Sequence, residues 1–171
     1  MIKNVVIIGA GNVATHLSKA IKNAGFNILQ IASRTEESAR ELGTLLDVPY
    51  TSSADDFNTS AELYIYSVKD DAIHSALSTF TPRRDALVVH TAGSVPMDIL
   101  SDFSSNIGIL YPLQTFSKAK EVDFTQIPLY IEANNIANTN TLLAFASTIS
   151  ERAKVVNSAT RAKVHLAAVF A

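Results

Sequence analysis

The chain has 171 residues, with 14 basic and 16 acidic side chains and a formal net charge of −2. Because 47% of the residues are hydrophobic and only 18% are charged, the composition excludes an intrinsically disordered chain. The near-neutral charge argues against a nucleic-acid-binding protein, which would carry a basic excess. The lack of cysteine excludes disulfides, thiolate metal sites and cysteine nucleophiles.

The N-terminus opens on a short apolar strand pattern over residues 2–8 and shows no signal-peptide h-region or cleavage site. No apolar run reaches the roughly 20 residues that a membrane span requires. We therefore expect a soluble, cytoplasmic protein that does not interact with the membrane.

Short apolar runs alternate with helical patterns along the whole chain. The patterns predict strands over residues 2–8, 26–32, 48–51, 62–68, 86–90, 107–110, 129–132 and 155–156. They predict helices over residues 12–24, 35–46, 96–103 and 138–150, and one more that Asp70 or Asp71 caps. This alternation predicts a Rossmann-type α/β fold, with a doubly wound, mainly parallel sheet and helices on both of its faces.

A glycine-rich turn joins the first strand to the first helix, in the form Gly-x-Gly-x-x-Ala of the dinucleotide fingerprint. The first glycine permits a tight turn, and the second lets a pyrophosphate approach the backbone. The helix N-terminus then attracts the phosphate charge. The residues expected at the cofactor are Gly9, Ala10, Gly11, Asn12 and Val13. The alternative is a structural turn in which the glycines occur by coincidence.

The end of the second strand indicates which nucleotide binds. NAD sites usually have an acidic residue there, but this chain has Ser33, Arg34 and Thr35. The guanidinium of Arg34 can pair with a 2′-phosphate, and the two hydroxyls can donate hydrogen bonds, so the pattern favours NADP. In the alternative interpretation, Ser33 or Thr35 caps the next helix and Arg34 is a solvated surface charge. The missing acid also argues against an S-adenosylmethionine methyltransferase.

Two polar segments follow the fourth and fifth predicted strands, where ligands of doubly wound sheets bind. Residues expected there to line a nicotinamide–ribose pocket are Ser67, Val68, Lys69, Thr91 and Gly93. His90 is a candidate acid or base, although it could equally be a hydrogen-bonded strand-end side chain, and Lys69 could be a solvent-exposed charge. His16 and His74 lack partners at ligand spacing, so we expect no metal site.

The last segment, residues 158–171, is apolar almost all round from residue 164 onward, apart from His165. A helix that is apolar on every side is expected to be buried on every side. We therefore expect residues 1–157 to form an NADP-binding domain and residues 158–171 to begin an interdomain helix. Its burying partner would lie in a C-terminal domain that this sequence lacks or in another subunit. The alternative is a frayed native C-terminus.

Together, these segments resemble NADP-dependent reductases of the pyrroline-5-carboxylate reductase and 3-hydroxyisobutyrate dehydrogenase type, and deazaflavin-dependent NADP reductases. Residues 90–94, 108–116 and 164–171 are similar to a bacterial family of NADP oxidoreductases that add a helical C-terminal domain of unassigned function. The resemblance implies a small-molecule substrate, a pocket between two domains, and a homodimer formed through the C-terminal helical region of the full-length form. By its chemistry His165 is a reasonable acid or base on the interdomain helix, the alternative being a core histidine.

The leading hypothesis is therefore an enzyme that transfers hydride between NADP(H) and a small carbonyl, imine or hydroxy-acid substrate. The alternative is a sensing or assembly module that binds NADP without turnover, because the sequence contains no clear set of catalytic acid and base residues.

Overall fold

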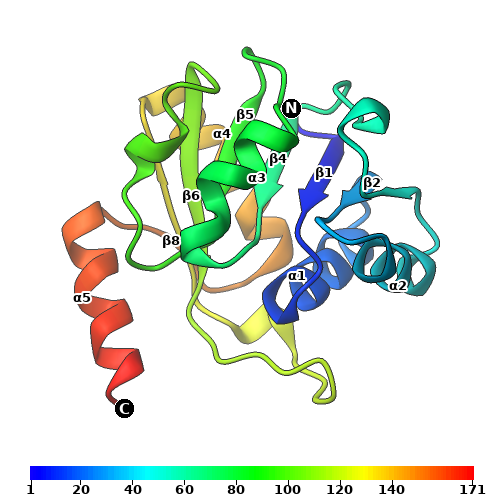
Figure 1. Ribbon diagram of the computed structural model, residues 1–171. Helices are drawn as coiled ribbons and strands as arrows, with labels where there is room; N and C mark the ends of the chain where they lie inside the picture. Colours follow the sequence, from blue (N-terminus) through cyan, green and yellow to red (C-terminus); the bar gives the residue numbers. More distant parts are fainter.

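The structure is a computed structural model that describes every residue from Met1 to Ala171. Its centre is an eight-stranded sheet in the order β3-β2-β1-β4-β5-β6-β7-β8 (Figure 1). The strands are β1 (Asn4–Ile8), β2 (Asn27–Ala32), β3 (Tyr50–Thr51), β4 (Leu63–Tyr66), β5 (Leu87–His90), β6 (Asn106–Pro112), β7 (Leu129–Ala133) and β8 (Ala153–Val155). Strands β1 to β6 are parallel, whereas β7 runs antiparallel to β6 and β8 runs parallel to β7.

Four helices connect the strands, and a fifth follows β8. They are α1 (Asn12–Asn23), α2 (Glu36–Leu46), α3 (Ile73–Thr79), α4 (Ile136–Ile149) and α5 (Ser158–Val169). Helix α1 ends where the sequence predicted, since Gly25 follows its C-cap with a φ of +94°. Because the strand order reverses at β1, with β2 on one side and β4 on the other, the predicted Rossmann-type fold is confirmed.

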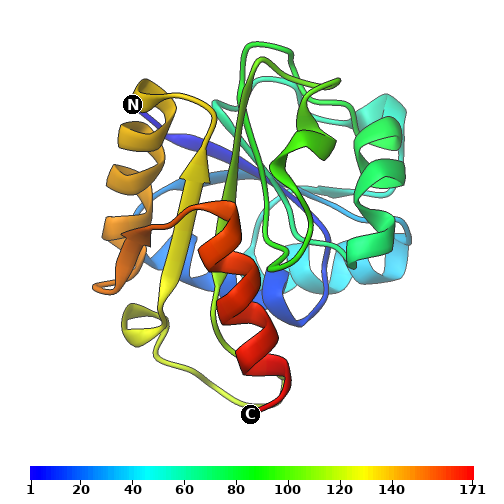
Figure 2. The ribbon, with the colours of Figure 1, turned by 90° about the vertical axis from the view of Figure 1, so that its left-hand side faces the viewer.

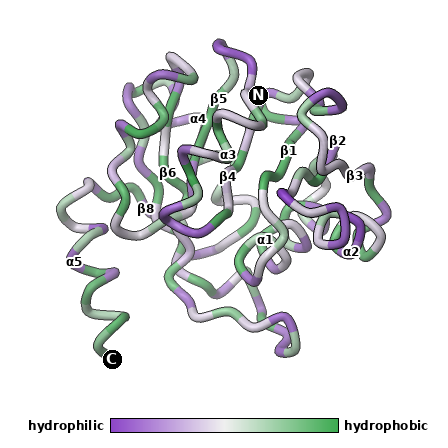
Figure 3. Tube along the Cα trace, in the orientation of Figure 1, coloured by the Kyte–Doolittle hydropathy of each residue, from purple (hydrophilic) through white to green (hydrophobic).

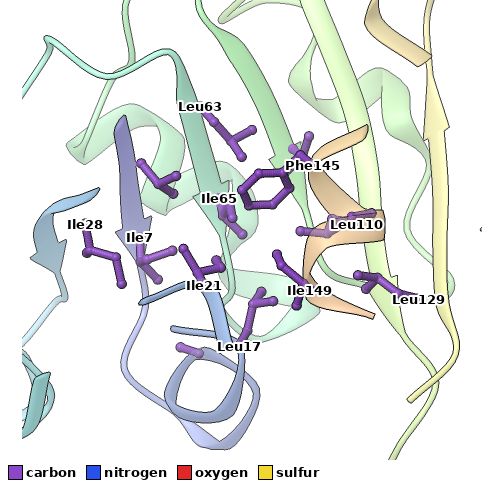
Figure 4. Close-up of a cluster of buried hydrophobic side chains, with 14 of the residues drawn as sticks. Ile7, Leu17, Ile21, Ile28, Leu63, Ile65, Leu110, Leu129, Phe145 and Ile149 are labelled. Atoms are coloured by element: carbon purple, nitrogen blue, oxygen red, sulfur yellow. The ribbon is translucent and has the colours of Figure 1, made fainter. Parts of the chain in front are cut away.

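Helices cover both faces of the sheet. Because successive side chains of a strand point to opposite faces, each central strand contributes to two separate cores. Val5 and Ile7 of β1 belong to a core that includes residues of α1, α2 and α4. Figure 4 shows part of it, where Leu17 of α1 and Phe145 of α4 meet the strands. Val6 and Ile8 belong to a second core, on the α3 side. These two cores hold the carboxyl ends of the parallel strands in fixed positions.

Two local predictions were wrong. Neither Asp70 nor Asp71 caps α3, because a 3₁₀ turn over Asp70–Ala72 leads directly into that helix and its N-cap residue is Ala72. The helix predicted over residues 96–103 is only a 3₁₀ turn, Met97–Leu100. In the residues that follow, the N–H groups of Ser101 and Phe103 donate to the carbonyls of Asp98 and Leu100, three residues earlier. This is the spacing of a 3₁₀ turn rather than of an α-helix.

Helix α5 lies along the side of the molecule, beyond the sheet (Figures 1 and 2). Only Arg161 of this helix is buried, whereas Leu166, Val169 and Phe170 near its end are 57%, 62% and 81% exposed. Figure 3 shows these last turns as a largely apolar segment that projects from the fold. The expected partner for this surface stays a prediction. No helix in the chain combines the length and apolarity that crossing a membrane requires.

Candidate active site

The glycine turn between β1 and α1 is held against the neighbouring strands. Gly9 has a φ of +117°, and a Cβ added to it would lie 2.0 Å from the carbonyl oxygen of Ser67, at the end of β4. The N–H of Gly9 also donates to the carbonyl of Ala32, at the end of β2, over 2.7 Å. The residue at position 9 therefore needs both the conformational freedom and the small size of glycine.

Gly11 has the opposite environment, because no atom lies within 4 Å of the place where its Cβ would stand. It is the N-cap residue of α1, and no side chain caps this helix or places an acid in its first turn. The first N–H groups of α1 therefore face open space with the positive end of the helix behind them. These residues fit a dinucleotide pyrophosphate, since an anion can approach the backbone where a Cβ would otherwise intrude.

The residues after β2 divide into different roles. The hydroxyl of Thr35 accepts from the N–H of Ser38 and caps α2, so it is engaged in helix structure. Arg34 is exposed and makes no hydrogen bond or ion pair within the chain, and Ser33 is half-buried at the strand tip. This arrangement leaves the Arg34 guanidinium available to a ligand at the carboxyl edge of the sheet.

The segments that follow β4 and β5 come together beside the glycine turn. The Thr91 hydroxyl donates to the Ser67 hydroxyl over 3.3 Å, and Ser67 itself touches the glycine turn. Val68 lies beside the same turn, whereas Lys69 is exposed and unpaired. The structure therefore brings Ser67, Val68 and Thr91 into one group with Gly9.

His90 is fully buried, and both of its ring nitrogens are engaged. Nδ1 accepts from the N–H of Ala92 over 3.1 Å, which leaves Nε2 to donate to the carbonyl of Pro96 over 3.3 Å. Burial lowers the pKa of His90 to about 4, so the ring is neutral near pH 7. This geometry favours the structural interpretation of His90, which orders the loop after β5, over the catalytic one.

His165 lies on α5 directly over the loop that follows β5. A Cβ on Gly93 would stand 2.3 Å from His165 Nδ1, so this glycine makes room for the imidazole. His165 Nδ1 also lies 2.8 Å from the hydroxyl of Tyr111, near the end of β6. The structure thus brings His165, Gly93 and Tyr111 together, although they come from three separate parts of the sequence.

Arg161 anchors the start of α5 to the sheet and to the same loop. Its guanidinium donates to the carbonyls of Gly93 and Val95 over 3.1 and 2.7 Å, and it pairs with Glu132 of β7 at 2.7 Å. The hydroxyl of Ser158 donates to the same carboxylate over 2.8 Å. Sequence reasoning missed Arg161, Glu132 and Tyr111. The one sequence signal for Arg161 was its position just before the apolar segment that begins at residue 164.

The first part of the connection between β6 and β7, residues 113–122, is held against α1. His16 Nε2 donates to the carbonyl of Ser117 over 2.7 Å, and its ring stacks on Phe116 with centroids 5.3 Å apart. Lys19 forms an exposed ion pair with Glu121. Both ribbon views show this loop at the same end of the molecule as the C-terminus of α5 (Figures 1 and 2).

Taken together, the strand order, the glycine turn and the open N-terminus of α1 define a dinucleotide-binding domain of the Rossmann type. The chain belongs to the family of NADP oxidoreductases described as coenzyme F420-dependent, whose model matches residues 4–93. Membership of this family supports a nicotinamide cofactor. No match was found among curated proteins.

Several solved structures are similar to this chain. BF3122 from Bacteroides fragilis, provisionally named an NADP oxidoreductase, is 47% identical over 98% of this chain, with a TM-score of 0.93. Protein TM1727 from Thermotoga maritima is 23% identical over 98% of the chain, with a TM-score of 0.77, and shares the fold. A 1-pyrroline-5-carboxylate reductase from Streptococcus pyogenes is 16% identical over 90% of the chain and also shares the fold, with a TM-score of 0.68. The chain spans 66%, 63% and 57% of the lengths of these three proteins.

Proposed function

We propose that this protein binds NADP(H) and transfers hydride between it and a small carbonyl, imine or hydroxy-acid substrate. The observation that carries the proposal is the pairing of an open, uncapped α1 N-terminus at Gly11 with a free guanidinium at Arg34. The first feature suits a pyrophosphate, and the second suits a 2′-phosphate in the place where NAD sites have an acid.

The chain's own residues would divide the work along the carboxyl edge of the sheet. Backbone N–H groups at the start of α1 bind the pyrophosphate. The hydroxyls of Ser67, whose carbonyl touches the glycine turn, and of Thr91, which donates to Ser67, orient the rest of the cofactor. When bound, a nicotinamide donates or accepts hydride. His165 is the candidate for proton transfer with the substrate, because Gly93 leaves room for its ring beside the loop that carries Thr91.

We expect NADPH to bind more tightly than NADH, and the Arg34→Ala variant to lose this preference. A pairing of a guanidinium with a phosphate contributes about 1.5–3 kcal/mol, so NADPH affinity should fall roughly 10- to 100-fold while NADH affinity stays nearly constant. Isothermal titration with both nucleotides measures the effect. Arg40→Ala is the matched control, since Arg40 is an exposed and unpaired arginine further along the same segment. Equal affinities of the unmodified protein for the two nucleotides would contradict the assignment of NADP.

Catalysis separates this proposal from a module that binds NADP without turnover. The protein would be mixed with NADPH and, in separate reactions, an aldehyde, a 2-oxo acid, a cyclic imine and oxidised coenzyme F420. We expect a sustained loss of NADPH absorbance with at least one carbonyl or imine compound, and a decrease in kcat of about 100-fold in His165→Gln, the lower end of the range for an acid–base group. Tight NADPH binding without turnover of any compound would favour the sensing or assembly module. Turnover of F420 alone would place a deazaflavin in the substrate role.

A further inference from the structure

Tyr111 is a buried residue close to the proposed site that the function above does not use. It lies near the carboxyl end of β6, and its hydroxyl is 2.8 Å from Nδ1 of His165. The two rings meet edge to face, with centroids 5.6 Å apart. This hydroxyl has no other hydrogen-bond partner in the chain, so the contact with His165 is its only one.

The direction of this hydrogen bond follows from the groups on either side of it. Burial raises the pKa of the Tyr111 hydroxyl above its ordinary value of 10, so the phenol keeps its proton at neutral pH. A buried O–H that donates to nothing costs free energy. Since Nδ1 of a neutral imidazole is the only acceptor within reach, the phenol donates and Nδ1 accepts.

We propose that Tyr111 is a positioning residue for the proposed reaction, because its hydrogen bond to Nδ1 keeps the proton of neutral His165 on Nε2. The catalytic role of Tyr111 rests on the proposed function, whereas its control of the His165 proton does not. Nε2 makes no hydrogen bond within the chain, so its N–H is available to a ligand. When the ring is protonated, Nε2 still carries hydrogen and the phenol oxygen can accept from Nδ1. His165 therefore presents a donor at Nε2 in both charge states.

A fixed donor selects the substrate by its chemistry. A carbonyl oxygen has lone pairs for the Nε2–H, and it gains negative charge as hydride arrives at its carbon, which a donor stabilises. A protonated imine has no lone pair on nitrogen and cannot accept from the same group. The geometry therefore favours a carbonyl compound reduced to an alcohol over a cyclic iminium. In this reduction the carbon gains hydride from NADPH, which leaves as NADP⁺. The oxygen takes the Nε2 proton of the protonated His165 ring, and the ring is left neutral with its Nδ1–H directed at the Tyr111 oxygen.

Two contacts between α5 and the loop after β5 keep the imidazole in place. Gly93 lies so close to the ring that any side chain there would displace it. Arg161, one helical turn before His165, fixes the start of α5 to the carbonyls of Gly93 and Val95. Tyr111 then sets which nitrogen carries the proton. Gly93 and Tyr111 therefore contact the ring itself, and Arg161 holds the helix that carries it.

The test is ¹⁵N NMR of the imidazole nitrogens in the whole chain without nucleotide, near pH 8, where His165→Gln identifies the signals among the four histidines. We expect His165 to be almost entirely the Nε2–H tautomer in the unmodified protein and a mixture of tautomers in Tyr111→Phe. Tyr130→Phe is the matched control, because Tyr130 pairs with Tyr111 across β6 and β7 and makes no hydrogen bond through its hydroxyl. A predominant Nδ1–H form in the unmodified protein, or a tautomer ratio that Tyr111→Phe leaves unchanged, would overturn the proposal. Far-ultraviolet circular dichroism would verify that both variants fold.

A kinetic measurement distinguishes this inference from the function on which it rests. With a carbonyl compound that the protein reduces, Tyr111→Phe should lower kcat about tenfold and leave KM within about twofold, because the lost hydrogen bond acts on the transition state. An unchanged kcat would argue against the positioning role even if the tautomer shifts. If no compound is turned over, the proposed function fails, while the NMR result still decides whether Tyr111 controls the His165 proton.

Discussion

Replacing Gly9 by alanine is expected to destabilise the fold by about 2–6 kcal/mol, a sum of backbone strain and steric overlap. The φ of +117° is outside the range that alanine readily adopts, and the new Cβ would stand 2.0 Å from the Ser67 carbonyl oxygen. That oxygen belongs to the backbone at the end of β4 and cannot rotate away as a side chain could. Urea denaturation followed by circular dichroism measures the loss, and a stability within 1 kcal/mol of the unmodified protein would contradict the close approach.

Gly11→Ala is the matched variant, because the same added methyl group meets no protein atom within 4 Å. We expect its free energy of unfolding to stay within about 1 kcal/mol of the unmodified protein, the usual penalty for this helix end being small. Its affinity for NADPH should fall at least about tenfold, since the methyl group enters the space proposed for the pyrophosphate. If Gly11→Ala bound NADPH normally, the pyrophosphate would not lie at this helix N-terminus.

The second large effect is expected for Arg161→Met, which keeps the apolar length of the side chain and removes its charge. The guanidinium is almost completely buried and serves Glu132 and the carbonyls of Gly93 and Val95. Breaking a buried pair by removing one partner costs about 3–5 kcal/mol, and we expect the low end because the Glu132 side chain is 18% exposed. Urea denaturation measures the change, and amide hydrogen exchange should show α5 losing protection first.

Two further variants make the Arg161 result specific. Lys163→Met changes an exposed cation on the same helix and should alter stability by less than about 0.5 kcal/mol. Adding Glu132→Gln to Arg161→Met removes the unpaired carboxylate and should restore part of the lost stability. If Arg161→Met were as stable as the unmodified protein, Arg161 would not be the residue that anchors α5.

The cofactor half of the candidate site could be predicted from local sequence. Gly9 and Gly11 occupy fixed places relative to a buried strand and a helix start, and such short-range geometry depends on neighbouring residues alone. The same local reasoning raised two interpretations for Thr35 and for His90 but could not choose between them. Their hydrogen bonds, to Ser38 and to Ala92 and Pro96, give both residues a structural role, and their roles at a cofactor or in catalysis stay predictions.

Local sequence was enough to predict the Rossmann-type fold and the glycine turn, because hydrophobic periodicity and turn chemistry are properties of short segments. The tertiary structure was needed to find the Arg161–Glu132 pair, the room that Gly93 leaves for His165, and the 2.8 Å contact between the Tyr111 hydroxyl and the His165 ring. These residues are between 29 and 72 positions apart in the chain, and no local pattern relates them. Their contacts exist because β5, β6 and β7 are neighbours in one sheet and Arg161 ties α5 to the loop after β5, an arrangement set by long-range strand pairing.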